Sequence, residues 1–411
     1  MSDRSAIVIV GAGEAGTAAA VALRQAGWRG MVVLVGNETM LPYERPPLSK
    51  GVLIDEINPG PKLIVTSERF AELEIDYRQG SEVVSIDRAA NMVSLSDGSG
   101  IAYHRLLLAT GARPRKLPVP VAEGVKVATL RTYEDAARIR RAIGQGCKVV
   151  VIGGGFIGLE VAVSAILRGA LVTILEAGPR LLTRAVPAPM AEMIIAKHER
   201  AGVRIETSAT VERIDFSEGR SNVVMAGGRS YEADLVIVGV GATPNVDLAQ
   251  AAGLAVDDGI LVDETLASSD PNVFAAGDCC SFPHRLYQKR VRLEAWRNAQ
   301  RQGAAAAANM MGENRPYEDV PWFWSDQYDE TLQIVGLAPE GEVPIIRDLG
   351  PKGQIAFYLA ADRRLVAACG FGSLSSVARE IRFAEMMISR RLSPTVEALA
   401  DPAISLKTLV V

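Results

Sequence analysis

The chain has 411 residues, of which 48% are hydrophobic and 22% charged, and its formal net charge is −4. These values predict a globular protein of two or three domains with a sizeable core. The negative charge argues against nucleic acid as a partner, and no apolar run is long enough to cross a membrane. Four cysteines without a Cys-x-x-Cys pair and three scattered histidines predict neither a disulfide framework nor a metal site. We therefore expect a cytoplasmic protein without bound metal.

A strand, a glycine loop, a helix and a second strand are predicted at the N-terminal end, over 6–10, 11–16, 17–25 and 31–35. The loop spells G-x-G-x-x-G through Gly11, Gly13 and Gly16. The first glycine of such a loop permits a tight turn, the second admits a pyrophosphate, and the third lets helix and strand pack closely. The helix N-terminus offers N–H groups to phosphate. Glu38, after the second strand, is the candidate acid for the ribose.

The same pattern recurs over 148–152, 153–158, about 159–167 and 171–175. Its glycines are Gly153, Gly155 and Gly158, and Glu176 lies 23 residues after the first of them. An acid in that place repels a 2′-phosphate and favours NADH over NADPH. One glycine loop is weak evidence, because such a turn can exist without a ligand. Two loops in the same frame predict two dinucleotides, FAD and NAD(P).

Further motifs follow in a fixed order: "PYERPPLSK" at 42–50, "RLLLATGARP" at 105–114, "GGGFIGLE" at 153–160, "ILEAGPRLLTRA" at 174–185, "DPNVFAAGDC" at 270–279 and "VPWFWSDQYD" at 320–329. With them the chain resembles the FAD-dependent pyridine nucleotide-disulfide reductase superfamily. Within it the chain is similar to the ferredoxin reductases that serve Rieske oxygenases and cytochrome P450 systems, the biphenyl dioxygenase ferredoxin reductase and putidaredoxin reductase type.

The resemblance implies an α/β fold with two Rossmann-like dinucleotide-binding domains and a C-terminal α+β domain, as in glutathione reductase. We expect a discontinuous FAD domain at 1–114 and 244–321, an NADH domain at 115–243 and a C-terminal domain at 322–411. Residues 353–372 read as a β-hairpin with an Asp-Arg-Arg turn, and Cys369 on its second strand is expected in the core. Cys279 and Cys280 are expected to be packed thiols rather than a vicinal disulfide.

The resemblance also implies the residues of the site. Those expected to contact FAD are Gly11, Gly13, Ala15, Gly16, Glu38, Arg45, Lys50, Val83, Ala109, Thr110, Gly111, Arg131, Gly277, Asp278, Ala295, Trp296 and Trp324. Those expected to contact NADH are Gly153, Gly155, Phe156, Ile157, Gly158, Glu160, Glu176, Arg184 and Gly241. Catalytic roles fall to Lys50 and Glu160 as a pair beside flavin and nicotinamide, and to Trp324 at the flavin edge where electrons leave.

Ordinary structural interpretations stay open for several of these residues. Lys50 fits a solvated loop, and Glu160 fits an acid near a helix start. Arg131 fits a surface arginine before a helix, and Asp278 fits a turn-capping carboxylate. A tryptophan such as Trp324 is more often a core or interface residue than a redox partner.

The segment "YERPPLSK" at 43–50 contains no cysteine, although disulfide reductases of this superfamily carry their redox cysteines there. The resemblance therefore implies that electrons pass from flavin to an outside acceptor, a [2Fe-2S] ferredoxin, docking transiently on a monomer or weak dimer. Such ferredoxins are often acidic, so the basic stretch 285–301 and the C-terminal arginines form a candidate landing surface, with Arg297, Arg301, Arg382 and Arg390 at its centre. A solvated charged face is the alternative.

Four other functions compete with ferredoxin reduction. An NADH oxidase or monodehydroascorbate reductase would use the same cofactors, and a rubredoxin reductase would differ only in its protein acceptor. A redox-sensing binding protein of the apoptosis-inducing-factor type belongs to another class of function. Neither the ferredoxin nor the oxygenase that it feeds can be read from these residues.

Overall fold

The computed structural model describes residues 6–57, 59–183, 186–338 and 343–410, and its chain divides into two compact units. The first comprises Met1–Arg45, Pro61–Arg113 and Ala242–Asp319, and the second comprises Pro46–Gly60, Pro114–Gly241 and Val320–Val411. Within the described ranges no helix is both long and apolar enough to span a membrane.

A five-stranded parallel sheet forms the centre of the first unit, in the order β19-β7-β1-β2-β3. Its strands are β1 (Ile7–Val10), β2 (Val32–Gly36), β3 (Ile75–Gln79), β7 (Arg105–Leu108) and β19 (Val273–Ala275). All residues of β1, β2 and β19 are buried, as expected for short apolar strands of a parallel sheet that is covered on both faces.

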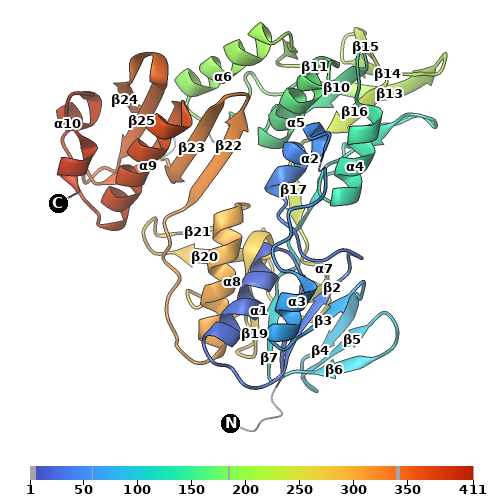
Figure 1. Ribbon diagram of the computed structural model, residues 1–411, viewed down its shortest axis with the longest axis vertical. Coiled ribbons are helices and arrows are strands. Elements are labelled where there is room, and N and C mark those ends of the chain that lie inside the picture. Colours follow the sequence, from blue (N-terminus) through green and yellow to red (C-terminus); the bar gives the residue numbers. More distant parts are fainter. Residues whose placement is uncertain (1–5, 58, 184–185, 339–342, 411) are drawn as a thin grey trace. The chain divides into compact units, whose positions relative to one another are not determined.

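Helices α1 (Glu14–Gln25) and α8 (Trp296–Met310) pack side by side in this unit (Figure 1). A Cβ atom on Gly303 of α8 would lie 2.1 Å from the carbonyl oxygen of Ala15 on α1. The backbones of the two helices therefore meet closely at Gly303, beside the alanine run of α8.

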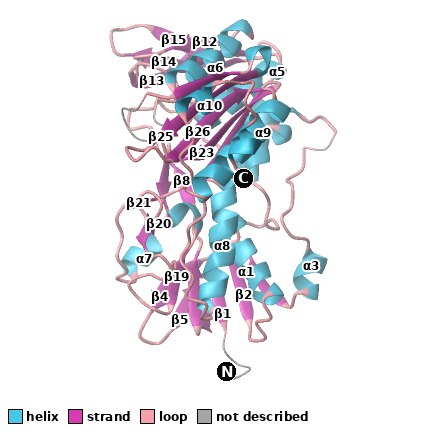
Figure 2. Cartoon of the chain, turned by 90° about the vertical axis from the view of Figure 1, so that its left-hand side faces the viewer, coloured by secondary structure: helices cyan, strands magenta, loops and turns pink. Residues whose placement is uncertain are grey.

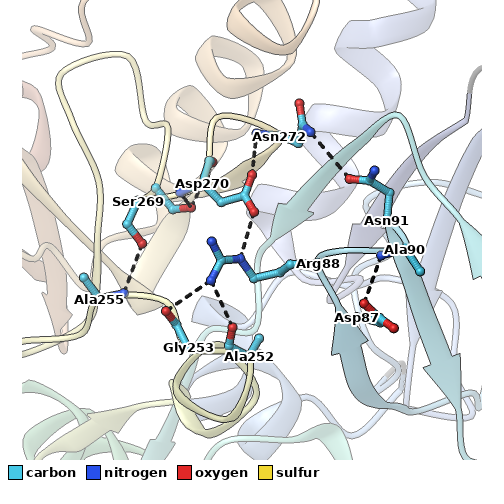
Figure 3. Close-up of polar contacts among 11 residues, drawn as sticks. Asp87, Arg88, Ala90, Asn91, Ala252, Gly253, Ala255, Ser269, Asp270 and Asn272 are labelled. Atoms are coloured by element: carbon cyan, nitrogen blue, oxygen red, sulfur yellow. Dashed lines mark hydrogen bonds and ion pairs between the residues drawn. The ribbon is translucent and has the colours of Figure 1, made fainter.

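A small antiparallel sheet of β4 (Val83–Asp87), β5 (Met92–Leu95) and β6 (Gly100–Ala102) belongs to the same unit. Figure 3 shows how Arg88 fastens it: the guanidinium donates to Asp270 Oδ2 over 2.8 Å and to the carbonyl oxygens of Ala252 and Gly253 over 3.3 Å. This half-buried ion pair joins the β4–β5 hairpin to the segment that enters β19.

The other elements of the first unit are short: α3 (Ser67–Glu72), β8 (Ala112–Pro114) paired with β17 (Ala242–Pro244), α7 (Asp247–Ala251), β18 (Ile260–Leu261), β20 (Cys280–His284) and β21 (Lys289–Val291). The last residue of β8, Pro114, is assigned to the second unit.

The second unit contains another five-stranded parallel sheet, in the order β12-β11-β10-β16-β9. Its strands are β9 (Val127–Ala128), β10 (Lys148–Ile152), β11 (Leu171–Leu175), β12 (Arg204–Glu206) and β16 (Leu235–Val238). Its helices are α2 (Gly51–Ile54), α4 (Tyr133–Ala142), α5 (Phe156–Leu167) and α6 (Ala188–Arg200), and β13 (Val211–Ser217), β14 (Arg220–Met225) and β15 (Ser230–Ala233) form a small antiparallel sheet.

The C-terminal part of this unit is an antiparallel sheet in the order β22-β23-β26-β25-β24. Its strands are β22 (Trp322–Gln327), β23 (Glu330–Gly336), β24 (Ile345–Asp348), β25 (Gly353–Leu359) and β26 (Leu365–Gly372). Helix α9 (Leu374–Ser389) packs against β23 and β26, as Figure 2 shows, and α10 (Val396–Ala400) follows. The predicted hairpin is confirmed as β25 and β26, and Cys369 is 2% exposed.

The predicted fold class is confirmed, with two parallel α/β sheets and a C-terminal α+β part. Both helices after the glycine loops begin three residues earlier than expected, at Glu14 and Phe156, because Gly13 and Gly155 are their N-caps. The strands at 148–152 and 171–175 have the predicted bounds. The division into three domains stays a prediction.

Arg347, on β24, is the largest fully buried side chain. Its Nη atoms donate to five carbonyl oxygens at the end of α10 and just beyond it, those of Ala398, Leu399, Asp401, Pro402 and Ile404. Its Nε lies 3.3 Å from Glu380 of α9, which is also buried. One guanidinium therefore fastens the C-terminal segment to the sheet.

We expect Arg347→Met to lower the free energy of unfolding by about 3–5 kcal/mol, because it leaves several buried carbonyl oxygens without their donor and removes one of the two guanidinium groups that are paired with the buried Glu380. The matched control is Arg364→Met, which removes an exposed pair with Asp362 in the β25–β26 turn and should cost less than about 1 kcal/mol. Denaturant unfolding followed by circular dichroism measures both. Equal losses for the two variants would contradict this account.

Candidate functional site

The first glycine loop has two glycines that the backbone itself requires. Gly11 has φ +108°, and a Cβ on it would lie 2.2 Å from the carbonyl oxygen of Ala109. A Cβ on Gly16 would lie 1.9 Å from the carbonyl oxygen of Gly11. At Gly13, the N-cap of α1, no atom of the described residues lies within 4 Å of such a Cβ, and no described side chain caps the helix. Space and N–H groups are thus available together, as a pyrophosphate needs.

The turn at Ala109, Thr110 and Gly111 borders this loop. The Ala109 N–H donates to the Val10 carbonyl over 2.8 Å, which continues the β7–β1 pairing. The Thr110 hydroxyl and the Asn245 amide exchange hydrogen bonds with each other's carbonyl oxygens over 2.7 and 2.8 Å. Gly111 has φ +69°. The predicted turn is thereby held in one conformation beside Gly11.

The Gly277-Asp278 segment forms a short 3-10 helix against α8. The Gly277 N–H donates to Gln302 Oε1 over 2.8 Å, and this glycine has φ +80°. Ala295 is the N-cap of α8 and Trp296 is its first residue. The structure therefore places Gly277 against the N-terminal half of α8, the helix that begins at the predicted Ala295 and Trp296.

Glu38 and Arg45 form an ion pair in the first unit. Arg45 Nη2 donates to Glu38 Oε1 over 2.7 Å, and the Tyr43 hydroxyl donates to Glu38 Oε2. Both side chains of the pair remain 30% exposed, so a ligand could reach them. Val83 opens β4 and is buried.

Glu14 is a residue of this site that the motif did not reveal, because the pattern leaves its position free. It is the first residue of α1, and Gln300 of α8 donates to its Oε1 over 3.1 Å. Burial, followed by repulsion from Glu44, raises the pKa of Glu14 to about 7. A carboxyl group with a raised pKa therefore lies at the helix N-terminus.

The second glycine loop repeats this geometry in the other unit. Gly153 has φ +110°, and a Cβ on it would lie 2.5 Å from the Gly239 carbonyl oxygen. A Cβ on Gly158 would lie 2.3 Å from the Gly153 carbonyl oxygen. At Gly155 the nearest atom to such a Cβ is 4.0 Å away. A side chain would therefore clash with the backbone at the first and third glycines of this loop, whereas the second glycine has free space beside it.

Glu176 is fixed by two backbone donors. Its Oε2 accepts from the Gly154 N–H and its Oε1 from the Gly178 N–H, both over 2.7 Å. The carboxylate is thus held beside the N-terminus of α5. Phe156 opens α5, with its ring 4.3 Å from that of Phe323, whereas Ile157 is 46% exposed.

Gly241 and Arg184 are the remaining residues predicted to contact NADH. Gly241 takes φ +113° directly before β17. Arg184 lies outside the described residues.

Lys50 and Glu160 form the predicted pair within the second unit. Lys50 Nζ lies 2.8 Å from Glu160 Oε2, and the glutamate is 4% exposed. The Ser49 hydroxyl donates to the same oxygen over 2.5 Å. Lys50 Nζ also lies 5.9 Å from the centre of the Trp324 ring. The alternative interpretations of Lys50 as a solvated lysine and of Glu160 as an acid in the first turn do not fit this geometry. Lys50 is paired, and Glu160 is buried in the second turn of α5.

The loop that carries Lys50 is shaped by two prolines. Pro46–Ser49 forms a 3-10 helix, in which the proline rings restrict φ. Ser164 of α5 donates to the Ser49 carbonyl oxygen over 2.6 Å. Trp322 stacks on Trp324 with ring centres 5.2 Å apart, because alternate residues of β22 share a face.

The FAD residues predicted from the resemblance are divided between the units. Lys50, Arg131 and Trp324 belong to the second unit, and the others belong to the first. Arg131 directly precedes the Thr132 capping box of α4, and its N–H donates to Asp135 over 3.0 Å.

The basic stretch 285–301 is largely paired with acids. Arg285 binds Glu264 and Glu318, and Arg292 binds Asp258 and Glu294. Arg301 lies 3.1 Å from Asp319. These pairs reduce the positive charge that the sequence suggested. Of the C-terminal arginines, Arg390 donates to the Val410 carbonyl, and both it and Arg382 are exposed.

Comparison with known proteins adds to this geometry. The family model for pyridine nucleotide-disulphide oxidoreductases matches residues 5–303, and the model for the reductase C-terminal domain matches 322–410. The chain belongs to the pyridine nucleotide-disulphide oxidoreductase family. The predicted oxidoreductase class and its cofactors FAD and NAD(H) are thereby confirmed. Among the described residues no cluster of three His, Cys, Asp or Glu could hold a metal ion.

The relatives show similarity over the whole chain. The anthranilate 1,2-dioxygenase system ferredoxin--NAD(+) reductase component of Burkholderia cepacia is 38% identical, over 98% of each chain. The rubredoxin-NAD(+) reductase of Pseudomonas putida is 40% identical over 88% of this chain and 94% of its own. A covalent putidaredoxin reductase–putidaredoxin complex matches with a TM-score of 0.93 and 38% identity, over 100% of this chain and 99% of that one.

We expect Gly13→Ala to lower the affinity for FAD at least tenfold without unfolding the protein. Its methyl group would enter space that is free of protein atoms but needed by a pyrophosphate. Flavin fluorescence on dilution gives the dissociation constant, and the melting temperature reports the fold. Gly144→Ala is the control, because its Cβ also meets no described atom. Unchanged FAD affinity in Gly13→Ala would refute the assignment.

Proposed function

We propose that this chain is an NADH-dependent ferredoxin reductase that supplies a [2Fe-2S] ferredoxin of a Rieske oxygenase or cytochrome P450 system. The observation that carries the proposal is the similarity of the whole chain, C-terminal domain included, to a dioxygenase-system ferredoxin reductase. Bound FAD supplies the chemistry, since it can take two electrons together from NADH and release them one at a time.

The cysteines support direct transfer to an outside acceptor. The four cysteines, all within the described ranges, are free thiols, and none lies in the segment 43–50. Cys279, Cys280 and Cys369 are buried, and burial raises the pKa of each thiol. A buried thiol that stays protonated is a poor nucleophile, so these residues do not serve as a disulfide relay.

The chain's own residues divide the work as follows. The N–H groups at the start of α1 bind the FAD pyrophosphate, and Glu38 binds its ribose. The start of α5 and Glu176 do the same for NADH. Lys50 is paired with Glu160, and this pairing offsets the cost of holding its ammonium group in a half-buried place. The roles of Lys50, Glu160 and Trp324 toward flavin rest on the family resemblance.

For an acidic ferredoxin we propose two candidate contact areas, the exposed Arg382 and Arg390 in the second unit and Arg297 and Arg301 in the first. The ion pairs of 285–301 leave a weaker field than the sequence alone suggested. The oligomeric state, monomer or weak dimer, and the cytoplasmic location also stay predictions.

The test mixes the FAD-loaded protein with NADH and then with a [2Fe-2S] ferredoxin, a rubredoxin or dioxygen in a stopped-flow instrument. We expect ferredoxin to reoxidise the flavin at least tenfold faster than dioxygen does. We also expect added salt to slow the reduction of ferredoxin but not the reduction of ferricyanide. Faster electron transfer to rubredoxin would identify a rubredoxin reductase. Reoxidation by dioxygen alone would identify an oxidase, and very slow reoxidation by every acceptor would favour a redox sensor.

The preference for NADH should depend on Glu176. We expect Glu176→Gln to reduce the ratio of kcat/KM for NADH over NADPH roughly tenfold, because a neutral side chain no longer repels a 2′-phosphate. Steady-state reduction of ferricyanide with each nucleotide measures this ratio. Glu199→Gln, on the exposed face of α6, is the control and should leave it unchanged. A ratio unaltered in Glu176→Gln would contradict the assignment.

A further inference from the structure

A line of buried hydrogen bonds leads away from Glu160 inside the second unit. Its first member is Ser325 of β22, whose Oγ lies 2.6 Å from Glu160 Oε1. Gln327, two residues further along the same face of β22, lies 2.9 Å from Ser325 through its Nε2. His198 of α6 lies 2.9 Å from Gln327 through Nε2 and Oε1. Ser325, Gln327 and His198 are each 0% exposed.

The chemistry of these groups fixes the direction of every bond in the line. An ionised Glu160 accepts only, so the Ser325 hydroxyl donates to it. The Ser325 oxygen then accepts from the Gln327 amide N–H, which turns the Gln327 oxygen toward His198. His198 must therefore carry its proton on Nε2. All donors point toward Glu160, which also receives Ser49 and Lys50 on its other oxygen.

The far end of the line is built to keep His198 neutral. Burial lowers the pKa of His198, and the neighbouring Lys197 acts in the same direction. The Tyr328 hydroxyl lies 3.4 Å from His198 Nδ1, with its ring edge-on at 5.2 Å. Tyr328 reaches this place with φ +60°, a left-handed conformation that costs free energy for a bulky residue. The surrounding structure thus holds it there.

Charged groups near His198 are balanced against one another. Lys197 forms ion pairs with Asp329 and Glu330 in the β22–β23 turn and at the start of β23, so its charge is neutralised outside the line. On the Glu160 side, Lys50 is the charged neighbour. The line itself contains no second charge.

We infer that Ser325, Gln327 and His198 are positioning residues that hold the Glu160 carboxylate ionised and in one orientation beside Lys50. This inference rests on the proposed function, in which the Lys50–Glu160 pair serves hydride transfer from NADH. A buried hydrogen bond to a charged acceptor is stronger than one between neutral groups, so each lost link should be measurable.

The experiment follows the pH dependence of the rate at which NADH bleaches the flavin absorbance, in single-turnover stopped flow. For Ser325→Ala and Gln327→Met we expect the maximal rate to fall about tenfold and the acid limb of the profile to move about one pH unit upward. A carboxylate that has lost a donor needs a higher pH to be ionised. The dissociation constant for NAD⁺, measured by its perturbation of the flavin spectrum, should change less than threefold.

Conservative variants separate positioning from loss of packing. Ser325→Thr keeps the hydroxyl and should restore the wild-type profile. His198→Gln keeps an N–H donor close to the place of Nε2 and should shift the profile less than His198→Leu. Arg200→Gln removes an exposed charge at the same end of α6 and should leave the profile unchanged. FAD content and melting temperature, recorded for every variant, identify any that does not fold.

The variants test the inference, whereas the wild type tests the proposed function. Wild-type profiles in Ser325→Ala and Gln327→Met would overturn the inference, as would a displaced profile in Ser325→Thr equal to that in Ser325→Ala. If Ser325→Ala does not fold, the two His198 variants test the inference instead. Equal shifts of the pH profile in His198→Gln and His198→Leu would then overturn it. Failure of the wild type to reduce any ferredoxin would instead refute the proposed function.

Discussion

Each parallel sheet ends in a loop where the backbone leaves no room for a side chain, and the rest of each dinucleotide fold depends on that contact. Gly16 packs against the carbonyl oxygen of Gly11, and Gly158 packs against that of Gly153. The close approach brings the helix N-terminus directly over the end of the first strand. It also leaves the second glycine of each loop facing space without protein atoms. The same constraint thus shapes the fold and creates the place for a phosphate.

The buried charge of Glu160 imposes a second constraint. A carboxylate that is 4% exposed must be supplied with hydrogen-bond donors, because burying a charge without partners is costly. The second unit supplies them from two segments, the proline-shaped loop that carries Ser49 and Lys50 and the strand β22 that carries Ser325, while His198 of helix α6 contacts β22 at Gln327. Moving the loop or the strand would break a bond to the carboxylate, and moving α6 would remove the support of Gln327. The charge therefore fixes their packing as well as its own orientation.

The glycine loops, the paired strands and the acid after each second strand could be predicted, because each follows from local spacing along the chain. The start of each helix could not be predicted as well, since Glu14 and Phe156 follow N-caps without a capping side chain. Glu14 itself was missed because the motif places no demand on its position, and its raised pKa comes from burial against α8. Pairing of the basic stretch was also missed, because some of its acids lie as far away in sequence as Asp258 and Glu318.

The hydrogen-bonded line from Glu160 to His198 could be predicted from the sequence only in part. Ser325 and Gln327 stand in the "WSDQ" stretch, two residues apart, and alternation along a strand would predict that they share a face. Nothing local says that α6, more than a hundred residues earlier, lies against that face with a histidine. The direction of the hydrogen bonds follows only once the line is known to end at an ionised acceptor, Glu160, because every other member, His198 Nε2 included, must then donate toward it. The sequence alone would assign His198 to the core. In the structure it is the last hydrogen-bond donor of the line that ends at the Lys50–Glu160 pair.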